Sequence, residues 1–212
     1  RFYYSKWRPS FSFNITPIKE LLGFSSKLII TNIFNIINAN LFSVLFGKIY
    51  GEKEVGFFNQ ANKWNNMGHS IISGMINGVA QPMLTTLCDD KKRQLNALRK
   101  MIRFTAFISF PTLFGLNFIA EEFIIIAITD KWLYSAYIME ILCIGGAFMP
   151  LNSLLANLII SRGHSSIHMW NTILLNLTQL IAALIIFPYG IERILYIFVA
   201  INISWLLIWT YF

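Results

Sequence analysis

Residues 86–111, TLCDDKKRQLNALRKMIRFTAFISFP, change abruptly from charged to apolar sequence. Eight charged side chains lie between Asp89 and Arg103, six of them basic, and no charge follows before Pro111. A dense Lys/Arg cluster by itself fits either a nucleic-acid surface or a solvated helix face. The apolar sequence that follows decides between them, because it is typical of a chain that enters a membrane, here near Phe104.

The composition also indicates a protein embedded in lipid. Of the 212 residues, 56% are hydrophobic and only 13% are charged, and the mean hydropathy is +0.57. A soluble domain carries about 25% charged residues, so this chain lacks the side chains to cover a surface in water. Cys88 and Cys143 have neither a metal-ligand nor a disulfide spacing, and we expect no metal and no cofactor. Because the chain begins at Arg1 and ends in apolar sequence at Phe212, we expect it to be part of a longer protein.

Six segments have the length and apolarity of membrane-spanning helices, which need about 20 apolar residues each. They are separated by stretches rich in charge, glycine and proline, including residues 47–64, the basic run and residues 120–136. We therefore predict an all-α polytopic membrane protein, with residues 1–22 as an interfacial cytoplasmic connector and residues 23–212 as a region of six transmembrane helices. The predicted spans are 28–46, 67–86, 104–120, 137–160, 167–187 and 194–212.

The distribution of Lys and Arg predicts the orientation of these spans. With the amino terminus in the cytoplasm, twelve bases lie on the cytoplasmic side and five on the other, in accordance with the positive-inside rule. The basic run then forms a cytoplasmic loop that contacts anionic lipid headgroups. Nucleic acid is not an expected partner, because no aromatic stacking pattern accompanies the bases.

Polar side chains recur at spacings of three and four residues within the predicted spans, and such residues share one helix face. One interpretation is that they join neighbouring helices by hydrogen bonds. The other is that the helices surround a polar cavity, because amides facing lipid would be costly. The second interpretation gives these candidate cavity-lining residues: Asn35, Asn38, Asn66, Ser70, Ser73, Asn77, Gln81, Asn157, Thr172, Asn176 and Gln179.

Charged residues near the spans are candidates for binding an ion or a phosphate. Glu140, the single acid within a predicted span, is a candidate for ion coupling or reaches water at the interface. Pro111 and Pro150 lie within spans and predict kinks. Four bases at the ends of spans are explained by topology, and any that turn inward could pair with a phosphate: Lys27, Lys63, Arg103 and Arg162.

No catalytic constellation is evident in the sequence. Asp89 and Asp90 are adjacent and point in different directions on a helix, with three bases directly after them. His69, His164 and His168 lie at the ends of spans on both sides of the membrane. We therefore expect a protein that is not an enzyme.

Several local motifs follow one another in order between residues 6 and 166. They are KWRPSFSF (6–13), GKIYGEKEVGFFNQANKW (47–64), CDDKKRQLNALRKMIRF (88–104), FISFPTLFGL (107–116), ITDKW (128–132) and ILCIGGAFMPLNSLLANLIISRGHSS (141–166). This ordered set resembles the polysaccharide flippases of the multidrug, oligosaccharidyl-lipid and polysaccharide exporter superfamily, in particular the lipopolysaccharide and exopolysaccharide group.

The resemblance implies a fold, a cargo and partners. In that family two pseudo-symmetric six-helix lobes enclose a cavity that opens alternately to each side of the bacterial inner membrane. The chain then corresponds to the second lobe, joined to the first by residues 1–22. The implied activity is flipping of an undecaprenyl-pyrophosphate-linked oligosaccharide to the outer leaflet, with the first lobe, membrane lipids and a polysaccharide polymerase as partners. A drug or small-cation antiporter of the same superfamily is the alternative, and a membrane enzyme of glycan assembly is a third.

The sequence departs from the family pattern at three positions. Family members often carry an Arg and an Asp in the segment that corresponds to NANLFSVLFGK, where this chain has Ala39 and Phe42. A glycine usual before the Lys-Trp pair is Thr129. The first departure removes a strong charge that this lobe would otherwise bring to the cavity.

Overall fold

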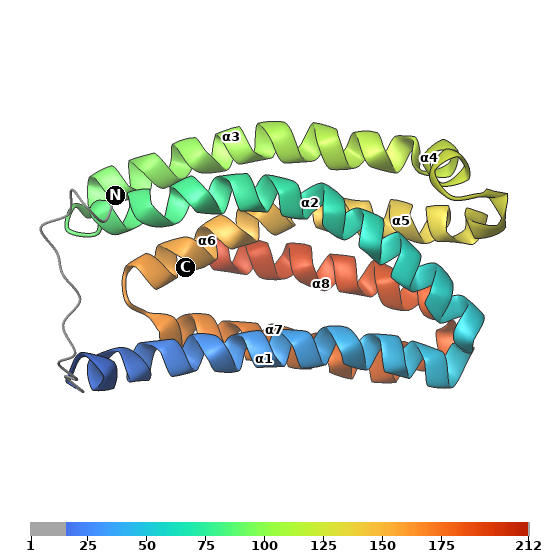
Figure 1. Cartoon of the computed structure of the whole chain (residues 1–212), viewed down its shortest axis with the longest axis horizontal. Helices are drawn as coiled ribbons and strands as arrows, with labels where there is room; N and C mark the ends of the chain where they lie inside the picture. Colours follow the sequence, from blue (N-terminus) through green and yellow to red (C-terminus); the bar gives the residue numbers. More distant parts are fainter. Residues whose placement is uncertain (1–15, 212) are drawn as a thin grey trace, which may run out of the picture.

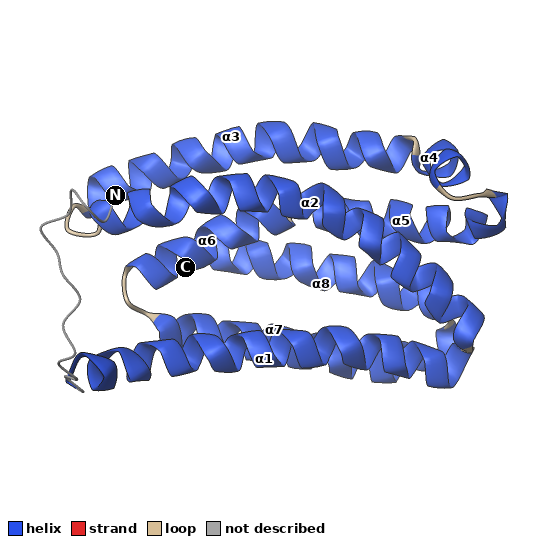
Figure 2. Ribbon diagram, in the orientation of Figure 1, coloured by secondary structure: helices blue, strands red, loops and turns tan. Residues whose placement is uncertain are grey.

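The computed structural model describes residues 16–211. Residues 1–15 of the predicted connector lie outside this range, and residues 16–22 belong to the first helix. All described elements are helical, and no strand is present among them (Figure 2). The elements are α1 (Thr16–Tyr50), α2 (Glu52–Thr86), α3 (Lys91–Phe118), α4 (Ala120–Ala127), η1 (Asp130–Trp132), α5 (Leu133–Gly146), α6 (Met149–Ser161), α7 (Ser165–Ile186), η2 (Phe187–Tyr189) and α8 (Ile191–Tyr211).

The long helices run back and forth along one axis, and consecutive passes meet at alternate ends (Figure 1). The all-α, multi-pass membrane architecture is confirmed, because five segments are long and apolar enough to cross a bilayer. Helix α2 has 35 residues, as many as α1, but its charged and amide side chains make it too polar to meet the same criterion. A sixth crossing therefore stays a prediction. The five segments are Leu22–Tyr50, Lys91–Phe118, Asp130–Ser161, Ser165–Tyr189 and Ile191–Thr210.

A single residue, Gly51, connects α1 to α2, although the sequence predicted a boundary over residues 47–64. The φ angle of Gly51 is 100°, a conformation that costs glycine little and other residues much more. Glu52 and Glu54 lie in the first turn of α2, where acidic side chains favour a helix N-terminus. Residues 52–64 of the predicted boundary are helical, and charged side chains such as Lys53 lie exposed on the helix surface. Where the second span begins along α2 stays a prediction.

The basic run is the first half of α3 and not a loop. Asp90 begins the helix by accepting a hydrogen bond from the backbone N–H of Arg93 at 3.0 Å. The six bases are exposed, whereas Gln94, Ala97 and Leu98 are buried against the neighbouring helices. The charges therefore mark the solvated face of an amphipathic helix. The prediction of a loop did not take into account that Gln94, Ala97 and Leu98 are spaced as on one helix face.

Two more segments differ from the predicted pattern. The predicted boundary at residues 120–136 contains α4, η1 and the start of α5. The predicted span 137–160 is divided between α5 and α6 close to Pro150, where a kink was expected. Helix α3 continues through Pro111 without interruption.

The break between α5 and α6 is stabilised by a side chain from α3. Pro150 has no backbone N–H, and the N–H of Leu151 donates to the Phe148 carbonyl at 3.1 Å. The Ala147 carbonyl, which is buried, accepts a hydrogen bond from Ser109 Oγ at 2.7 Å. Since a buried carbonyl without a partner is costly, Ser109 supplies the bond that the broken helix lacks.

Replacing Ser109 by alanine is expected to lower the free energy of unfolding by about 1–3 kcal/mol, the cost of a buried acceptor without a partner. Thermal unfolding of the purified protein in detergent measures the effect. Thr112→Ala is the matched control on α3, because Thr112 is exposed and its hydroxyl donates only to the Ile108 carbonyl of its own helix. Equal melting temperatures for the two variants would contradict this role of Ser109.

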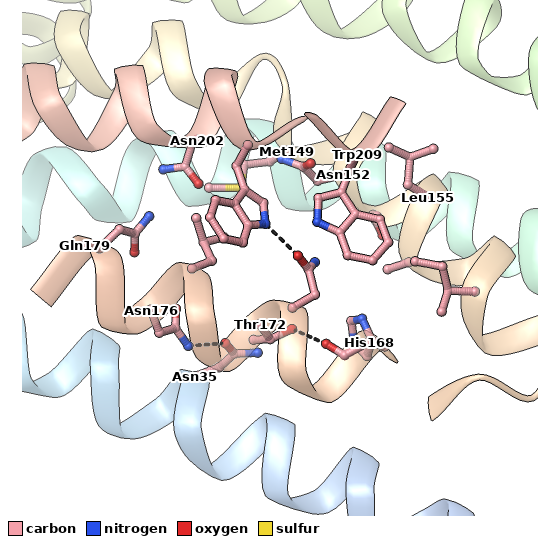
Figure 3. A pocket seen from close by; sticks show the side chains of 16 residues that line it. Asn35, Met149, Asn152, Leu155, His168, Thr172, Asn176, Gln179, Asn202 and Trp209 are labelled. Atoms are coloured by element: carbon pink, nitrogen blue, oxygen red, sulfur yellow. Dashed lines mark hydrogen bonds between the residues drawn. The ribbon is translucent and has the colours of Figure 1, made fainter. Parts of the chain in front are cut away.

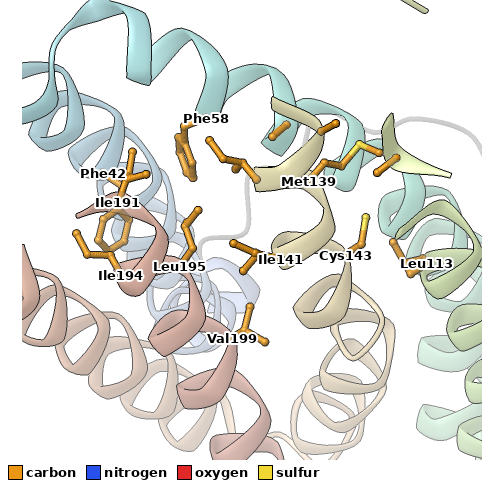
Figure 4. Close-up of a cluster of buried hydrophobic side chains, with 14 of the residues drawn as sticks. Phe42, Phe58, Leu113, Met139, Ile141, Cys143, Ile191, Ile194, Leu195 and Val199 are labelled. Carbon is orange, nitrogen blue, oxygen red and sulfur yellow. The ribbon is translucent and has the colours of Figure 1, made fainter. Parts of the chain in front are cut away.

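Two apolar clusters, at opposite ends of the bundle, hold the helices together. The large core joins the end of α1 and the start of α2 to α5 and α8, and it includes Phe42, Phe58, Ile141 and Leu195 (Figure 4). The small core lies near the turn between α2 and α3 and consists of Ala80, Leu84, Leu98 and Leu154. Between the cores the helices carry polar side chains, and there the candidate site lies.

Candidate functional site

Two neighbouring cavities lie between the helices in the middle of the bundle. One, of about 280 Å³, lies among α1, α2, α5, α7 and α8 and reaches the start of α6. The other, of about 350 Å³, lies among α1, α6, α7 and α8 (Figure 3). Both are lined by Asn35, Met149, Gln179 and Asn202. We refer to the two cavities together as the amide cavity.

Ten of the thirty lining residues carry side-chain amides, set among mainly apolar groups, and some of these amides bond to each other across helices. Asn38 Nδ2 donates to Asn176 Oδ1 at 3.1 Å, and Asn176 Nδ2 donates to Asn35 Oδ1 at 3.0 Å, which joins α1 to α7. A primary amide has two donor hydrogens and an acceptor oxygen. These bonds leave part of that capacity directed at the cavity, where Asn35 is exposed.

Helices α2 and α5 approach closely beside the cavity. The side chain of Asn65 contacts Gly146, where a Cβ atom would overlap the Asn65 amide oxygen. That oxygen is buried and has no hydrogen-bond partner among the described residues. Phe42 and Phe198 also line the cavity, with ring centroids 4.6 Å apart in an edge-to-face arrangement. The amide-rich face is thus bordered by tightly packed apolar groups.

Six of the eleven predicted cavity-lining residues line the amide cavity: Asn35, Asn38, Asn66, Thr172, Asn176 and Gln179. The other five do not: Ser70, Ser73, Asn77, Gln81 and Asn157. Among these, Asn77 Oδ1 accepts hydrogen bonds from Ser153 Oγ and Asn157 Nδ2, each at 2.7 Å. For Asn77 and Asn157 the alternative interpretation describes the structure, because these side chains join α2 to α6.

Several polar or aromatic lining residues were missed by the sequence analysis. For Asn62 and Asn65 the reason is the predicted start of the span at residue 67, which left the preceding residues in a loop. On α8, Asn202 is the one amide, and Trp205 and Trp209 on the same helix face were not counted as polar. The missed residues include Asn62, Asn65, His69, Asn152, Asn171, Asn202, Trp205 and Trp209.

Within the described residues, no Asp, Glu, Lys or Arg lines the amide cavity. Arg162 Nε donates to Gln94 Oε1 at 2.9 Å near the α2–α3 turn. Lys63 Nζ lies 5.8 Å from the centre of the Trp64 ring, and Lys27 and Arg103 lie on α1 and α3 outside the cavity. The four candidate phosphate ligands are therefore not brought together, and a phosphate role for them stays a prediction.

Glu140 also lies outside the amide cavity. It is half-buried on α5, and its backbone carbonyl accepts a hydrogen bond from Asn117 Nδ2 at 2.6 Å. The described part of the chain contains no group of three His, Cys, Asp or Glu side chains that could hold a metal ion. The chemistry available in the cavity is thus hydrogen bonding by amides, hydroxyls and the imidazoles of His69 and His168, together with the indoles of Trp205 and Trp209.

The fold and the cavity define a multi-pass helical membrane protein with a group of amide side chains between its helices. A family model described as "Polysaccharide biosynthesis protein" matches residues 1–137. An "uncharacterized membrane protein in cps region" of Klebsiella pneumoniae is 31% identical over 159 residues, which cover 73% of this chain and 32% of that protein. The chain belongs to this family of polysaccharide biosynthesis proteins.

Further relatives have lower identity. A teichuronic acid biosynthesis protein of Bacillus subtilis is 24% identical over 78% of this chain and 34% of its own length. A lipopolysaccharide biosynthesis protein of Escherichia coli is 22% identical over 76% of this chain and 33% of its own length. No solved structure matches the chain. The chain therefore spans about a third of the length of the curated relatives that it matches.

Proposed function

We propose that the chain is one lobe of a transporter that moves an undecaprenyl-pyrophosphate-linked oligosaccharide across the bacterial inner membrane for surface polysaccharide biosynthesis. The observation that carries the proposal is the amide cavity, which is uncharged and offers many donors and acceptors inside an apolar bundle. Family membership and the names of the relatives support the same pathway. A second lobe elsewhere in the full protein completes the cavity, and a polysaccharide polymerase receives the cargo.

The amide cavity suits the glycan part of such a cargo. Sugar hydroxyls are both donors and acceptors, as are Asn and Gln amides, so each can satisfy the other when water is excluded. Crossing the bilayer core without such partners would cost several kcal/mol per polar group. Transport then needs no covalent chemistry in this lobe, and the protein acts as a transporter and not as an enzyme.

A drug or small-cation antiporter of the same superfamily is the second candidate function. Ion coupling within the membrane normally uses carboxylates, and Glu140 is the one candidate that the sequence gives in this region. Its position outside the amide cavity favours the glycolipid transporter. Glu140→Gln in the full protein is expected to leave glycan export unchanged, whereas ion-coupled transport that needs this carboxylate would stop.

Deletion of the full gene in the source cell tests the proposed function. Lipid-linked oligosaccharide is expected to accumulate in the cytoplasmic leaflet while surface polysaccharide falls, and the complete gene is expected to restore both. Unchanged pools would overturn the proposal. Accumulation of the lipid-linked units in the outer leaflet would instead indicate an enzyme that acts after flipping.

A further inference from the structure

An apolar groove runs between α7 and α8 on the outside of the bundle. It has a volume of about 490 Å³ and is formed by the first three turns of α7 and the last turns of α8. The exposed fractions of Trp170, Leu174 and Ile208 are 59%, 50% and 52%, so apolar side chains face outward along its whole length. The lining residues are Ser166, Ile167, Trp170, Asn171, Leu174, Trp205, Ile208 and Trp209.

The groove and the amide cavity share one wall. Asn171, Trp205 and Trp209 line both spaces. Trp205 Nε1 donates to Asn171 Oδ1 at 2.6 Å, which fixes the indole between the two helices. One side of this wall therefore faces amides and the other faces an apolar surface. A single ligand that contacts both sides must carry a polar part joined to an apolar part.

The groove lies at the end of the bundle where the α6–α7 connection and the end of α8 meet (Figure 1). The start of α1 and the turn between α2 and α3 lie at the same end, together with most of the basic residues. By the positive-inside rule this is the cytoplasmic end. An occupant of the groove is thus placed at the depth of the cytoplasmic leaflet.

We propose that the groove between α7 and α8 holds the first part of the polyprenyl chain of the cargo while the attached glycan lies in the amide cavity. The inference rests on the proposed function and adds the path of the lipid tail. An isoprenoid chain is apolar, as is the lining of the groove. Because Asn171, Trp205 and Trp209 line both spaces, tail and glycan would lie on the two sides of these residues. Trp205 at that wall suits a boundary between apolar and polar groups, because an indole presents an apolar ring and a polar N–H.

Photocrosslinking in the full-length protein tests the path. A benzophenone amino acid replaces Leu174 in the groove, or Ile181 as the control. Ile181 lies two turns further along α7, is 54% exposed, and does not line the groove. The probes are undecaprenyl-pyrophosphate carrying one hexose, and undecaprenol, which has the same tail without a headgroup. Adducts are identified by mass spectrometry after irradiation in nanodiscs.

Position 174 is expected to form about ten times more adduct with the glycolipid than with undecaprenol, because the bound head holds the tail in place. Position 181 is expected to react equally with both. Equal yields of the two lipids at position 174 would overturn the inference, since the groove would then be ordinary lipid-facing surface. A crosslink from position 174 to another segment of the protein would also overturn it, because the groove would be covered by protein.

Bulky variants in cells separate this inference from the proposed function. Leu174→Trp is expected to lower polysaccharide export about tenfold by filling the groove, while Ile181→Trp leaves it unchanged at equal protein abundance. If gene deletion abolishes export but Leu174→Trp does not lower it, the tail takes another path and the transport function stands. If deletion leaves export unchanged, the transport function itself fails.

Discussion

Replacing Gln94 by leucine is expected to lower the free energy of unfolding by about 2–4 kcal/mol, because several buried polar groups lose their partner at once. The Gln94 side chain is completely buried. Its Nε2 donates to the Leu84 carbonyl at 2.8 Å and to Ser161 Oγ at 3.2 Å, and its Oε1 accepts from Arg162 Nε at 2.9 Å. One amide thus joins α2, α3 and the end of α6.

Thermal and urea unfolding of the purified full-length protein in detergent measure this effect. Asn96→Leu is the matched control two residues away, because Asn96 is exposed and its replacement is expected to change stability by less than about 0.5 kcal/mol. Gln94→Glu retains an acceptor for Arg162 but loses both donated bonds, and should fall between the control and Gln94→Leu. If the Gln94→Leu protein had the same melting temperature as the wild type, the amide would not join these helices.

Replacing both Asn35 and Asn176 by leucine is expected to reduce glycan export at least tenfold, on the order of 1.4 kcal/mol or more. The two amides face the cavity from α1 and α7 and bond to each other. Leucine has a similar size but neither donates nor accepts, so glycan hydroxyls at this point would be left without partners. Surface polysaccharide in a deletion strain carrying the variant gene provides the measurement.

Two comparisons distinguish loss of cargo binding from loss of folding. Asn40→Leu changes an exposed amide on α1 that bonds to the Ile36 carbonyl and lies outside the cavity, and export should stay at the wild-type level. Protein abundance in the membrane and the melting temperature are measured for each variant. Normal export by the Asn35/Asn176 double variant at normal abundance would remove the amide cavity from the transport path.

Features of this fold that depend on a local sequence pattern could be predicted, whereas features that depend on contacts between distant helices could not. Membrane crossing follows from a long apolar stretch, so the all-α, multi-pass architecture was predictable. The connection at Gly51 was obscured by the charged residues after it, since charges occur equally in loops and on exposed helix faces. The break between α5 and α6 was signalled by Pro150, but the bond from Ser109 depends on a helix distant in sequence.

The candidate site was predictable in part for a similar reason. Regular spacing identified Asn35, Asn176 and Gln179, because one helix face is enough to define them. Spacing could not distinguish these cavity-lining residues from Asn77, which recurs at the same helical spacing but forms hydrogen bonds to α6. Asn202 is the one amide in its stretch of α8, and a lone polar residue has no periodicity. Its place in the cavity follows from the packing of α8 against its neighbours.

The unequal size of the two apolar cores gives the bundle unequal resistance to local opening. The large core fixes the end that holds the α1–α2 turn, whereas the small core at the other end consists of Ala80, Leu84, Leu98 and Leu154. The free energy of a local fluctuation is lower where fewer apolar groups must separate. We therefore expect thermal motion to separate the helices first at the end that contains the groove, while the opposite end stays packed and acts as a hinge.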